Sequence, residues 1–291
     1  MLDWDDLRVF LAIQRTGSLA GAATSLGINA TTVGRRLAAL EERAATKLFD
    51  RTPDGWVLTA TGRDILPRAE RMEAEALGVE RGIAGADQRL DGVVRVTVTE
   101  MLATRFIAPH LARFATQHPE ITLDLWCTNA IVNLSRREAD VALRLARPRE
   151  PDVISKQLAA IDLALYASRG YLDAHGRPED PERSLAGHIV LGFAASPPFR
   201  RENEWFDARA AGARIAMRSD SVSSIYAATA EGLGIGLLPR AVADHDPVLV
   251  RLPTQTAPEP RVIWQTMHKD LRASARVRAV TDFLAEILAA P

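Results

Sequence analysis

The sequence of 291 residues has very little cysteine, and Cys127 stands alone. One thiol cannot form a disulfide within the chain or supply a cysteine cluster for a metal, so both kinds of site are excluded. Because Cys127 lies in an apolar run typical of a strand, we expect a small core side chain and no redox sensor.

Long hydrophobic runs are lacking too, and the uncharged stretches fall well short of the roughly 20 residues that cross a bilayer. The first residues, MLDWDDL, are acidic where a secretory signal would be basic, so we expect a cytoplasmic protein without a membrane partner. The six histidines have no metal-ligand spacing, and no Walker loop or Gly-x-Ser-x-Gly elbow occurs. We therefore expect no metal, no cofactor and no enzyme activity.

Net charge is nearly absent as well, because 36 Lys and Arg balance 37 Asp and Glu. Such a balance argues at first against a nucleic-acid-binding protein. Between residues 29 and 63, however, six basic residues stand against four acidic ones, and a dimer would present two such patches. With 47% hydrophobic residues, the chain is long enough for two or three domains with cores of their own.

What the sequence does contain is a helix-turn-helix pattern at residues 18–40. Ala23 is small enough for a helix crossing, Gly27 can adopt the positive φ of a tight turn, and Val33 anchors the second helix. Asn29 is a suitable N-cap for that helix. We expect the rest of the chain to position this motif or to control it.

The second helix has a buried stripe and an opposite face suited to DNA. The stripe consists of Val33, Leu37, Leu40 and Ala44. The opposite face combines short side chains with arginine, which reads guanine edges and phosphates, and Gly34 would allow a close approach to the duplex. We expect Arg35 to read bases and Arg36 to contact phosphate. The alternative is an ordinary three-helix scaffold with a solvated arginine face.

Residues on either side extend this unit. Asp3 can cap a first helix that ends at Thr16-Gly17, and residues 47–59 form two β-prone runs around Thr52-Pro53-Asp54-Gly55, which predicts a wing. Lys47 and Arg51, at the base of the wing, are candidates for phosphate or minor-groove contacts, or else ordinary surface charges. The predicted DNA contacts are Ser18, Asn29, Thr31, Thr32, Arg35, Arg36, Lys47 and Arg51.

A long helix is predicted from Thr59 to Gly85, with apolar residues alternating at spacings of four and three. This heptad seam predicts a dimer interface made of Ile65, Ala69, Met72, Ala76, Val79 and Ile83. Pro67 should kink the first turns, because it removes a helical hydrogen bond. The alternative is that the seam packs on its own domain.

After a polar hinge at 86–92 the pattern changes to alternating strands and helices, which is βαβ architecture. The glycine-rich run 232–236 follows a helix and precedes a strand, the reverse of a dinucleotide loop, so it predicts a helix stop. The predicted strands are 93–99, 121–127, 140–145, 162–168, 188–193, 213–219, 235–238 and 261–267, and the predicted helices are 105–117, 131–137, 222–231 and 274–288.

The whole chain resembles the LysR-type transcriptional regulators. The resemblance rests on LRVFLAIQRTGSLAGAATSLGINATTVGRRLAALEERAATKLFDRTPDGWVLTATG, FIAPHLARFATQHPEITLDL, EADVALRL, EGLGIGLLP and RVRAVTDFLAEIL. It differs from the family in one base-reading position: the usual Ser-Gln-Pro/Ser is Asn29-Ala30-Thr31, so no operator preference can be carried over.

The resemblance implies an α/β protein with an N-terminal winged helix-turn-helix (1–60), a dimerising linker helix (61–86), a hinge (87–92) and a periplasmic-binding-protein-like effector domain (93–291). Its subdomain I would comprise about 93–161 and 268–291, and its subdomain II about 162–267. Implied partners are double-stranded operator DNA, a small-molecule effector and further copies of the chain, as a homodimer or homotetramer. The alternative is a C-terminal domain that only assembles oligomers.

In such a two-subdomain cleft, ligands lie at strand ends and helix N-termini. Glu100 at such a position favours a ligand with a donor or positive group, because a fixed carboxylate repels a second one. Each candidate could also be a simple helix cap or turn. The predicted effector contacts are Thr99, Glu100, Met101, Thr128, Asn129, Phe193, Ser219 and Ser221.

Overall fold

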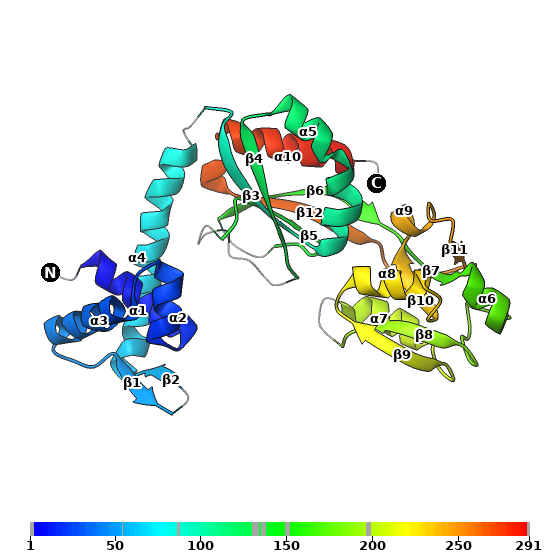
Figure 1. Ribbon diagram of the computed structural model, residues 1–291, viewed down its shortest axis with the longest axis horizontal. Helices are drawn as coiled ribbons and strands as arrows, with labels where there is room; N and C mark the ends of the chain where they lie inside the picture. The colour runs from blue at the N-terminus through cyan, green and yellow to red at the C-terminus, as the bar shows by residue number, and fades with distance from the viewer. Residues whose placement is uncertain are drawn as a thin grey trace. The chain divides into compact units, whose positions relative to one another are not determined.

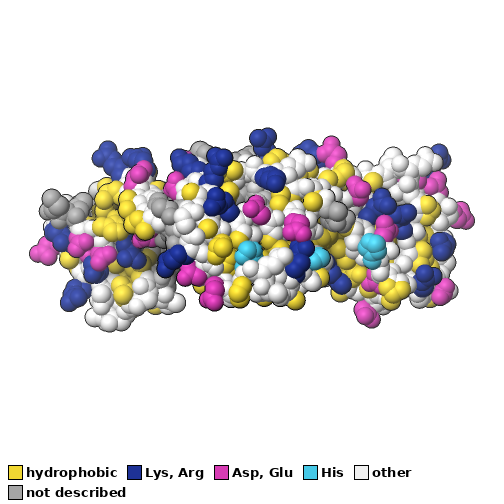
Figure 2. All heavy atoms as spheres, turned by 90° about the horizontal axis from the view of Figure 1, so that it is seen from above, with side chains coloured by type: hydrophobic (Ala, Val, Ile, Leu, Met, Phe, Trp, Pro, Cys, Tyr) yellow, Lys and Arg dark blue, Asp and Glu magenta, His cyan; other side chains and the backbone are white. Residues whose placement is uncertain are grey.

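The computed structural model describes residues 3–53, 55–85, 88–129, 134, 138–148, 152–195 and 199–289. The chain forms two compact units, residues 1–81 and 82–291 (Figure 1). Acidic and basic side chains are interspersed on the face shown in Figure 2, in keeping with the balanced composition. None of the helices in the described ranges is both long and apolar enough to span a bilayer.

The first unit opens with three helices whose ends lie where the sequence predicts them. The Asp3 carboxylate caps α1 by accepting from the N–H of Asp5, and Gly17 ends α1 with a φ of 68°. Gly27 ends α2 with a φ of 66°, and Asn29 caps α3. The predicted helix-turn-helix is therefore confirmed, with α1 at Trp4–Thr16, α2 at Leu19–Leu26 and α3 at Ala30–Ala44.

These helices share one core with the wing. Phe10, Ile13 and Val33 are fully buried, and the Phe10 ring lies 5.2 Å from that of Phe49. The wing is an antiparallel pair, β1 (Phe49–Thr52) and β2 (Gly55–Leu58). At Gly55 the φ is 126°, and a Cβ would lie 2.6 Å from the carbonyl oxygen of Gly17, so only glycine lets the wing approach the end of α1.

The long helix α4 (Ala60–Gly85) is continuous across Pro67. Along the predicted seam, Ala69 is buried in the core of the first unit and Ile65 packs against that core. Further along, Met72, Val79 and Ile83 are 50–71% exposed. The seam is thus divided: its first part packs on its own unit, and its later apolar residues stay exposed.

The second unit contains two five-stranded sheets, one in each lobe (Figure 1). The first has the order β4-β3-β5-β12-β6, and the second has the order β11-β7-β10-β8-β9. The strands are β3 Gly92–Val98, β4 Ile121–Cys127, β5 Val141–Arg144, β6 Val153–Ile161, β7 Leu163–Ser168, β8 Ile189–Phe193, β9 Arg214–Ser219, β10 Ile235–Pro239, β11 Leu249–Arg251 and β12 Arg261–His268.

Two features of these sheets differ from the sequence prediction. β6 and the short β11 were not predicted; most of β6 is half-buried or exposed, so its sequence has no clear apolar signal. The prediction placed residues 261–267 in subdomain II. That assignment is wrong, because β12 pairs with β5 and β6 of the first sheet.

Cys127 is also placed differently. It is exposed rather than buried in a core, because it ends β4, which lies at the edge of the first sheet.

The helices of the second unit cover both sheets. The helix predicted at 105–117 begins earlier, with a π-helical segment, and continues through a 3-10 turn containing Pro109. The helix predicted at 131–137 falls outside the described residues except for Leu134. The segments are η1 Leu102–Ile107, η2 Ala108–His110, α5 Leu111–Gln117, α6 Arg169–His175, α7 Arg200–Asp207, α8 Val222–Ala230, α9 Arg240–Ala243, η5 Lys269–Leu271 and α10 Ala275–Leu288. Of these, α6, α7, α9 and η5 were not predicted.

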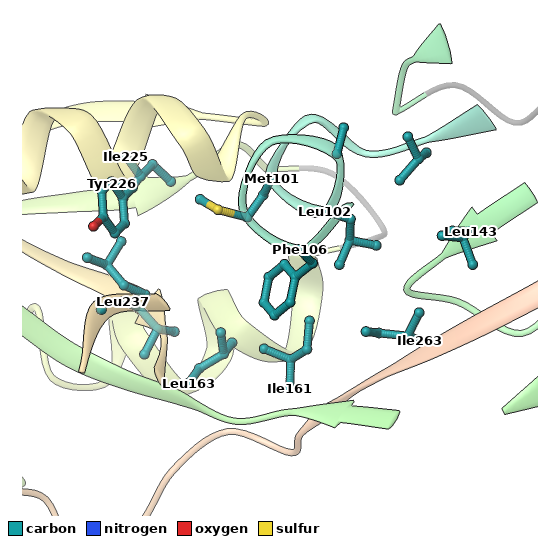
Figure 3. Packing of buried hydrophobic residues seen from close by; sticks show 14 of the residues in the cluster. Met101, Leu102, Phe106, Leu143, Ile161, Leu163, Ile225, Tyr226, Leu237 and Ile263 are labelled. Carbon is teal, nitrogen blue, oxygen red and sulfur yellow. The ribbon is translucent and has the colours of Figure 1, made fainter. Parts of the chain in front are cut away.

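One hydrophobic cluster runs through both lobes of the second unit. Figure 3 shows Met101 directed toward Ile225 and Tyr226 of α8, with Phe106 next to Ile161 and Leu163, where the chain passes from one lobe to the other. The lobes are therefore in contact through a buried apolar layer between η1 and α8.

Candidate DNA-binding face and inter-lobe site

The exposed face of α3 contains Thr31 and Arg35 as predicted. Arg35 is exposed and makes no hydrogen bond or ion pair with any residue in the described part of the chain. Asn29 holds the start of the helix, because its Oδ1 accepts from the N–H and the hydroxyl of Thr32 at 2.8 and 2.9 Å. The Arg35 guanidinium is therefore available to an outside partner, while Asn29 and Thr32 shape the N-terminus.

Arg36 has a different environment. Its guanidinium pairs with Asp5 at 3.3 Å and with the buried Asp6 at 3.3 Å, and Arg43 also pairs with Asp6. These contacts join α3 to the start of α1. A phosphate would have to compete with two carboxylates for Arg36, so its predicted phosphate contact loses support.

Lys47 also forms an ion pair within its own unit, with the buried Glu41. The buried Glu41 accepts from Lys47 Nζ at 2.6 Å and from the backbone N–H groups of Leu48 and Phe49 at 2.9 and 3.4 Å. Burial acts to raise the pKa of Glu41, but these hydrogen bonds outweigh it and hold the pKa below its ordinary value. Glu41 thus clamps the end of α3 to the start of the wing.

The last two predicted DNA contacts differ from each other. The Ser18 hydroxyl caps α2 by accepting from the N–H of Gly21 at 3.0 Å, so it has a structural role already. Arg51 is exposed on β1, opposite Trp56 across the wing. Of the predicted contacts, Arg51 and Arg35 are the basic side chains that the described structure leaves without an internal partner.

In the second unit, two hydrogen bonds join the lobes at predicted residues. The Ser221 hydroxyl, which caps α8, donates to Glu100 Oε2 at 3.2 Å. The Asn129 amide donates to the carbonyl oxygen of Asp220 at 3.1 Å. Sequence positions more than 90 residues apart therefore meet at the boundary between the two lobes.

Buried hydroxyl oxygens lie next to these contacts. Thr99 Oγ1 and Ser223 Oγ are both buried and have no hydrogen-bond partner among the described residues. Thr99 precedes Glu100, and Ser223 follows Ser221 by two residues. Because buried polar atoms in native proteins are nearly always hydrogen-bonded, these oxygens could hold a polar ligand group or water.

The other predicted effector contacts already have partners within the protein. Phe193 is buried in the second lobe, where its ring stacks on Phe199 at 4.7 Å, and Met101 is buried in the apolar layer between the lobes. Ser219 Oγ accepts from the N–H of Ser221 at 3.0 Å, and the N–H of Thr128 donates to Val98. The Phe193 and Met101 side chains thus support the fold instead of facing a ligand.

Arg144, at the carboxyl end of β5, was not among the predicted residues. Its guanidinium donates to Thr97 Oγ1 at 2.6 Å and to the carbonyl oxygen of Leu143 at 2.9 Å, and burial lowers its pKa. The available signal was a single arginine ending an apolar strand, VALR, next to the end of β3. Within the described ranges, no three His, Cys, Asp or Glu side chains form a group that could hold a metal ion.

Family models match both units. The model described as "Bacterial regulatory helix-turn-helix protein, lysR family" matches residues 4–63, and that described as "LysR substrate binding domain" matches residues 87–289. Together they span the helix-turn-helix, the wing and both lobes.

Named proteins are similar over nearly the whole chain. The transcriptional regulator CrgA of Neisseria meningitidis is 28% identical, covering 98% of this chain and 96% of its own, and the Mau operon transcriptional activator of Paracoccus denitrificans is 28% identical, covering 99% and 97%. The structure of CrgA matches with a TM-score of 0.60 at 27% identity over 99% of both chains. Full-length AphB of Vibrio cholerae, at 23% identity, matches in fold with a TM-score of 0.63 over 98% of this chain and 99% of its own.

Proposed function

The chain belongs to the LysR family of transcriptional regulators, and we propose that it is a dimer whose DNA binding is modulated by a small molecule held between its lobes. The family assignment makes the first unit a DNA-binding helix-turn-helix and the second a substrate-binding domain. The observation that carries the regulatory proposal is the pair of hydrogen bonds joining the lobes at Glu100 and Asn129.

We propose that Arg35 reads base edges, in support of which it is exposed on α3 and lacks an internal partner in the described structure. Arginine donates two parallel hydrogen bonds to guanine in the major groove. Arg36 is a positioning residue in this proposal, because it ties α3 to Asp5 and Asp6 of α1. Arg51 on the wing is a second candidate for contact with the backbone of DNA.

A comparison of Arg35→Ala with Arg36→Ala tests this division, using bound fragments selected from the source genome. Arg35→Ala should weaken cognate binding by about 1–3 kcal/mol and flatten specificity, with little effect on binding to random DNA. Arg36→Ala should lower the stability of the first unit and affect both kinds of DNA alike. Equal losses on cognate and random DNA for both variants contradict the assignment.

We propose α4 as the dimer interface, because its apolar residues Met72, Val79 and Ile83 are exposed. Beside them lies a groove of about 690 Å³ lined by Trp4, Met72 and Ala76 together with the charged side chains of Arg68, Arg71 and Glu75. A helix from a second copy would cover both. Val79→Asp should give monomers in sedimentation and no operator shift, while the neighbouring Glu80→Ala should leave the dimer intact. A persistent Val79→Asp dimer would place the interface elsewhere.

For the effector we propose a ligand with hydrogen-bond donors, held near Glu100, Ser221, Thr99 and Asn129. Glu100 already accepts from Ser221, and a donor group of the ligand can take that place. A thermal-shift screen of amines, amides, phenols and carboxylates tests this, since a ligand of the folded state raises the melting temperature. Glu100→Gln should abolish the shift of the best donor ligand. If Glu100→Gln leaves the shift of every active compound unchanged, the Glu100 placement is wrong.

The competing function is a second unit that only assembles oligomers. It predicts that no small molecule shifts the melting temperature, while deletion of the second unit lowers the oligomeric state.

A further inference from the structure

Two arginines of α3 are held by carboxylates that come from another helix. Arg36 and Arg43 stand about two helical turns apart, so they lie on the same side of α3. Both pair with Asp6 of α1, Arg36 at 3.3 Å, and Arg36 also pairs with Asp5 at 3.3 Å. The start of α1 therefore supplies negative charge to one flank of the helix that carries Arg35.

The burial of Asp6 makes this pairing hard to exchange. Asp6 is only 3% exposed, whereas the side chains of Arg36 and Arg43 are 33% and 41% exposed. An arginine that turned outward to a DNA phosphate would leave a buried carboxylate with one partner fewer, which costs much more than breaking an exposed pair. The two guanidinium groups are thus accessible to water but directed inward.

The position of the two acids at the start of α1 does not explain this arrangement. Acids in the first turn are favoured by the helix dipole, but that effect requires neither burial nor an arginine partner. Asp3 already caps α1. Nor are the ion pairs needed to bring the helices together, because α1 and α3 share an apolar core that includes Phe10 and Leu37. The pairing of Asp6 with two arginines therefore suggests a further role.

The pairing changes the charge that α3 can offer to DNA. The helix has three arginines, and with Arg36 and Arg43 held by acids, Arg35 is its arginine without an ion pair among the described residues. The number of phosphate contacts sets the affinity of a protein for DNA of any sequence, whereas contacts with base edges set its preference. Holding two of the arginines reduces the first contribution and leaves the second in place.

We propose that Asp5 and Asp6 are specificity-determining residues, which keep binding to non-operator DNA weak by holding Arg36 and Arg43 away from phosphates. The proposal rests on the function proposed above for α3, in which Arg35 reads base edges. A regulator must find its operator among a very large number of other sites, so the ratio of the two affinities matters more than either one. Acids that lower the affinity for other sites raise this ratio.

Salt titrations of the full-length protein on poly(dA-dT) and poly(dG-dC) duplexes test the proposal without knowledge of the operator. The variant with both Asp5→Asn and Asp6→Asn should bind these duplexes about threefold to tenfold more tightly at low salt. Its plot of log K against log salt should be steeper by about 0.9 for each phosphate gained. Glu42→Gln is the control, because it removes an exposed carboxylate of α3 that pairs with no described residue, and it should leave the slope unchanged.

Arg36→Gln separates the release of an arginine from a general change of charge. In the wild type it should leave the slope unchanged, because Arg36 contacts no phosphate there. In the variant that lacks both acids it should reverse part of the steepening. Asp5→Asn alone leaves no buried group unpaired and should steepen the slope less, so it decides the question if circular dichroism shows that the double variant is unfolded.

The proposal is overturned if the folded acid variants keep the slope of the wild type, or if Glu42→Gln steepens it as much. It is also overturned if Arg36→Gln lowers the slope equally with and without the two acids. Failure of the base-reading function has a different signature: Arg35→Ala would then keep its full preference for operator fragments, whatever the slopes of the acid variants.

Discussion

The two units use their polar side chains in opposite ways. In the first unit, the residues proposed for recognition lie on the outside of one helix and one strand, and acids behind them such as Asp6 and Glu41 are buried in ion pairs. In the second unit, the proposed contact residues pair with one another across the lobes, as Glu100 and Ser221 do. A protruding surface can thus be composed from one helix, whereas a cleft needs several distant segments.

This difference shows which residues can be replaced without changing the fold. Arg35 is exposed and makes no hydrogen bond or ion pair inside the described structure, so its loss should affect mainly an outside partner. Ser221 caps α8 and also bridges the lobes, so its loss affects both the helix and the interface. Four substitutions test the comparison, from the largest expected effect to the smallest.

Glu41→Ala tests whether buried acids hold the recognition surface together. It leaves the N–H groups of Leu48 and Phe49 without their acceptor, which should lower the free energy of unfolding of the first unit by about 2–3 kcal/mol. Urea unfolding measures the effect, and the neighbouring exposed Glu42→Ala is the control, expected within about 0.5 kcal/mol of the wild type. Equal stability of the two variants would refute the clamp.

Ser221→Ala tests the bridge between the lobes. It removes both an N-cap and the hydrogen bond to Glu100, so the second unit should lose about 1 kcal/mol of stability. Ser224→Ala is the matched control, because the Ser224 contact to Ser221 uses only its backbone N–H. If both serine variants unfold at the same urea concentration, Ser221 contributes nothing to either contact.

Gly34→Ala separates the needs of the fold from those of DNA binding. A Cβ at Gly34 would meet only Leu19 Cδ1, at 3.6 Å, so alanine fits and should stabilise α3 by about 0.8–1 kcal/mol. If the duplex approaches this backbone closely, operator affinity should fall although stability rises. Unchanged affinity in a gel-shift titration would show that Gly34 is not needed for close approach. Gly170→Ala in α6, where a Cβ would meet nothing within 4 Å, is the control in the second unit.

The smallest expected effect is a pH dependence confined to the second unit. Burial, followed by the neighbouring His175, lowers the pKa of His188 from its ordinary value of 6.5. The unfolded chain then binds more protons than the folded one, so stability should fall as the pH drops below about 6.5. His188→Gln should flatten this slope in urea unfolding between pH 7.5 and 5. A parallel slope in the variant would assign the pH dependence to other groups.

Much of the first unit followed from local patterns. Gly17, Gly27 and Asn29 each occupy the helix end predicted for them, because turn and cap preferences act within a few residues. The second unit was predicted less completely. β6 lacks a clear apolar pattern since much of it is half-buried or exposed, and β12 could be assigned to its lobe only through its pairing with β5 and β6.

For the predicted binding residues, too, local sequence patterns predicted some features, and only contacts between distant elements decided others. Periodicity alone placed Arg35 on the face opposite the buried stripe, and the structure agrees with that placement. It could not reveal that Arg36, one position further, is held by Asp5 and Asp6 from another helix. Nor could it separate Phe193, which is buried against Phe199, from residues at the lobe boundary.

The sequence by itself determined the helix-turn-helix, the wing, the long helix and the alternating strands and helices, since these depend on residues close together in the chain. Only the tertiary structure decided which charges are neutralised inside the protein, and which residues meet between the lobes. The hydrogen bond from Ser221 to Glu100 is an example, because 121 positions in the sequence separate the two residues. Contacts over such separations depend on how whole elements pack, and no local preference specifies them.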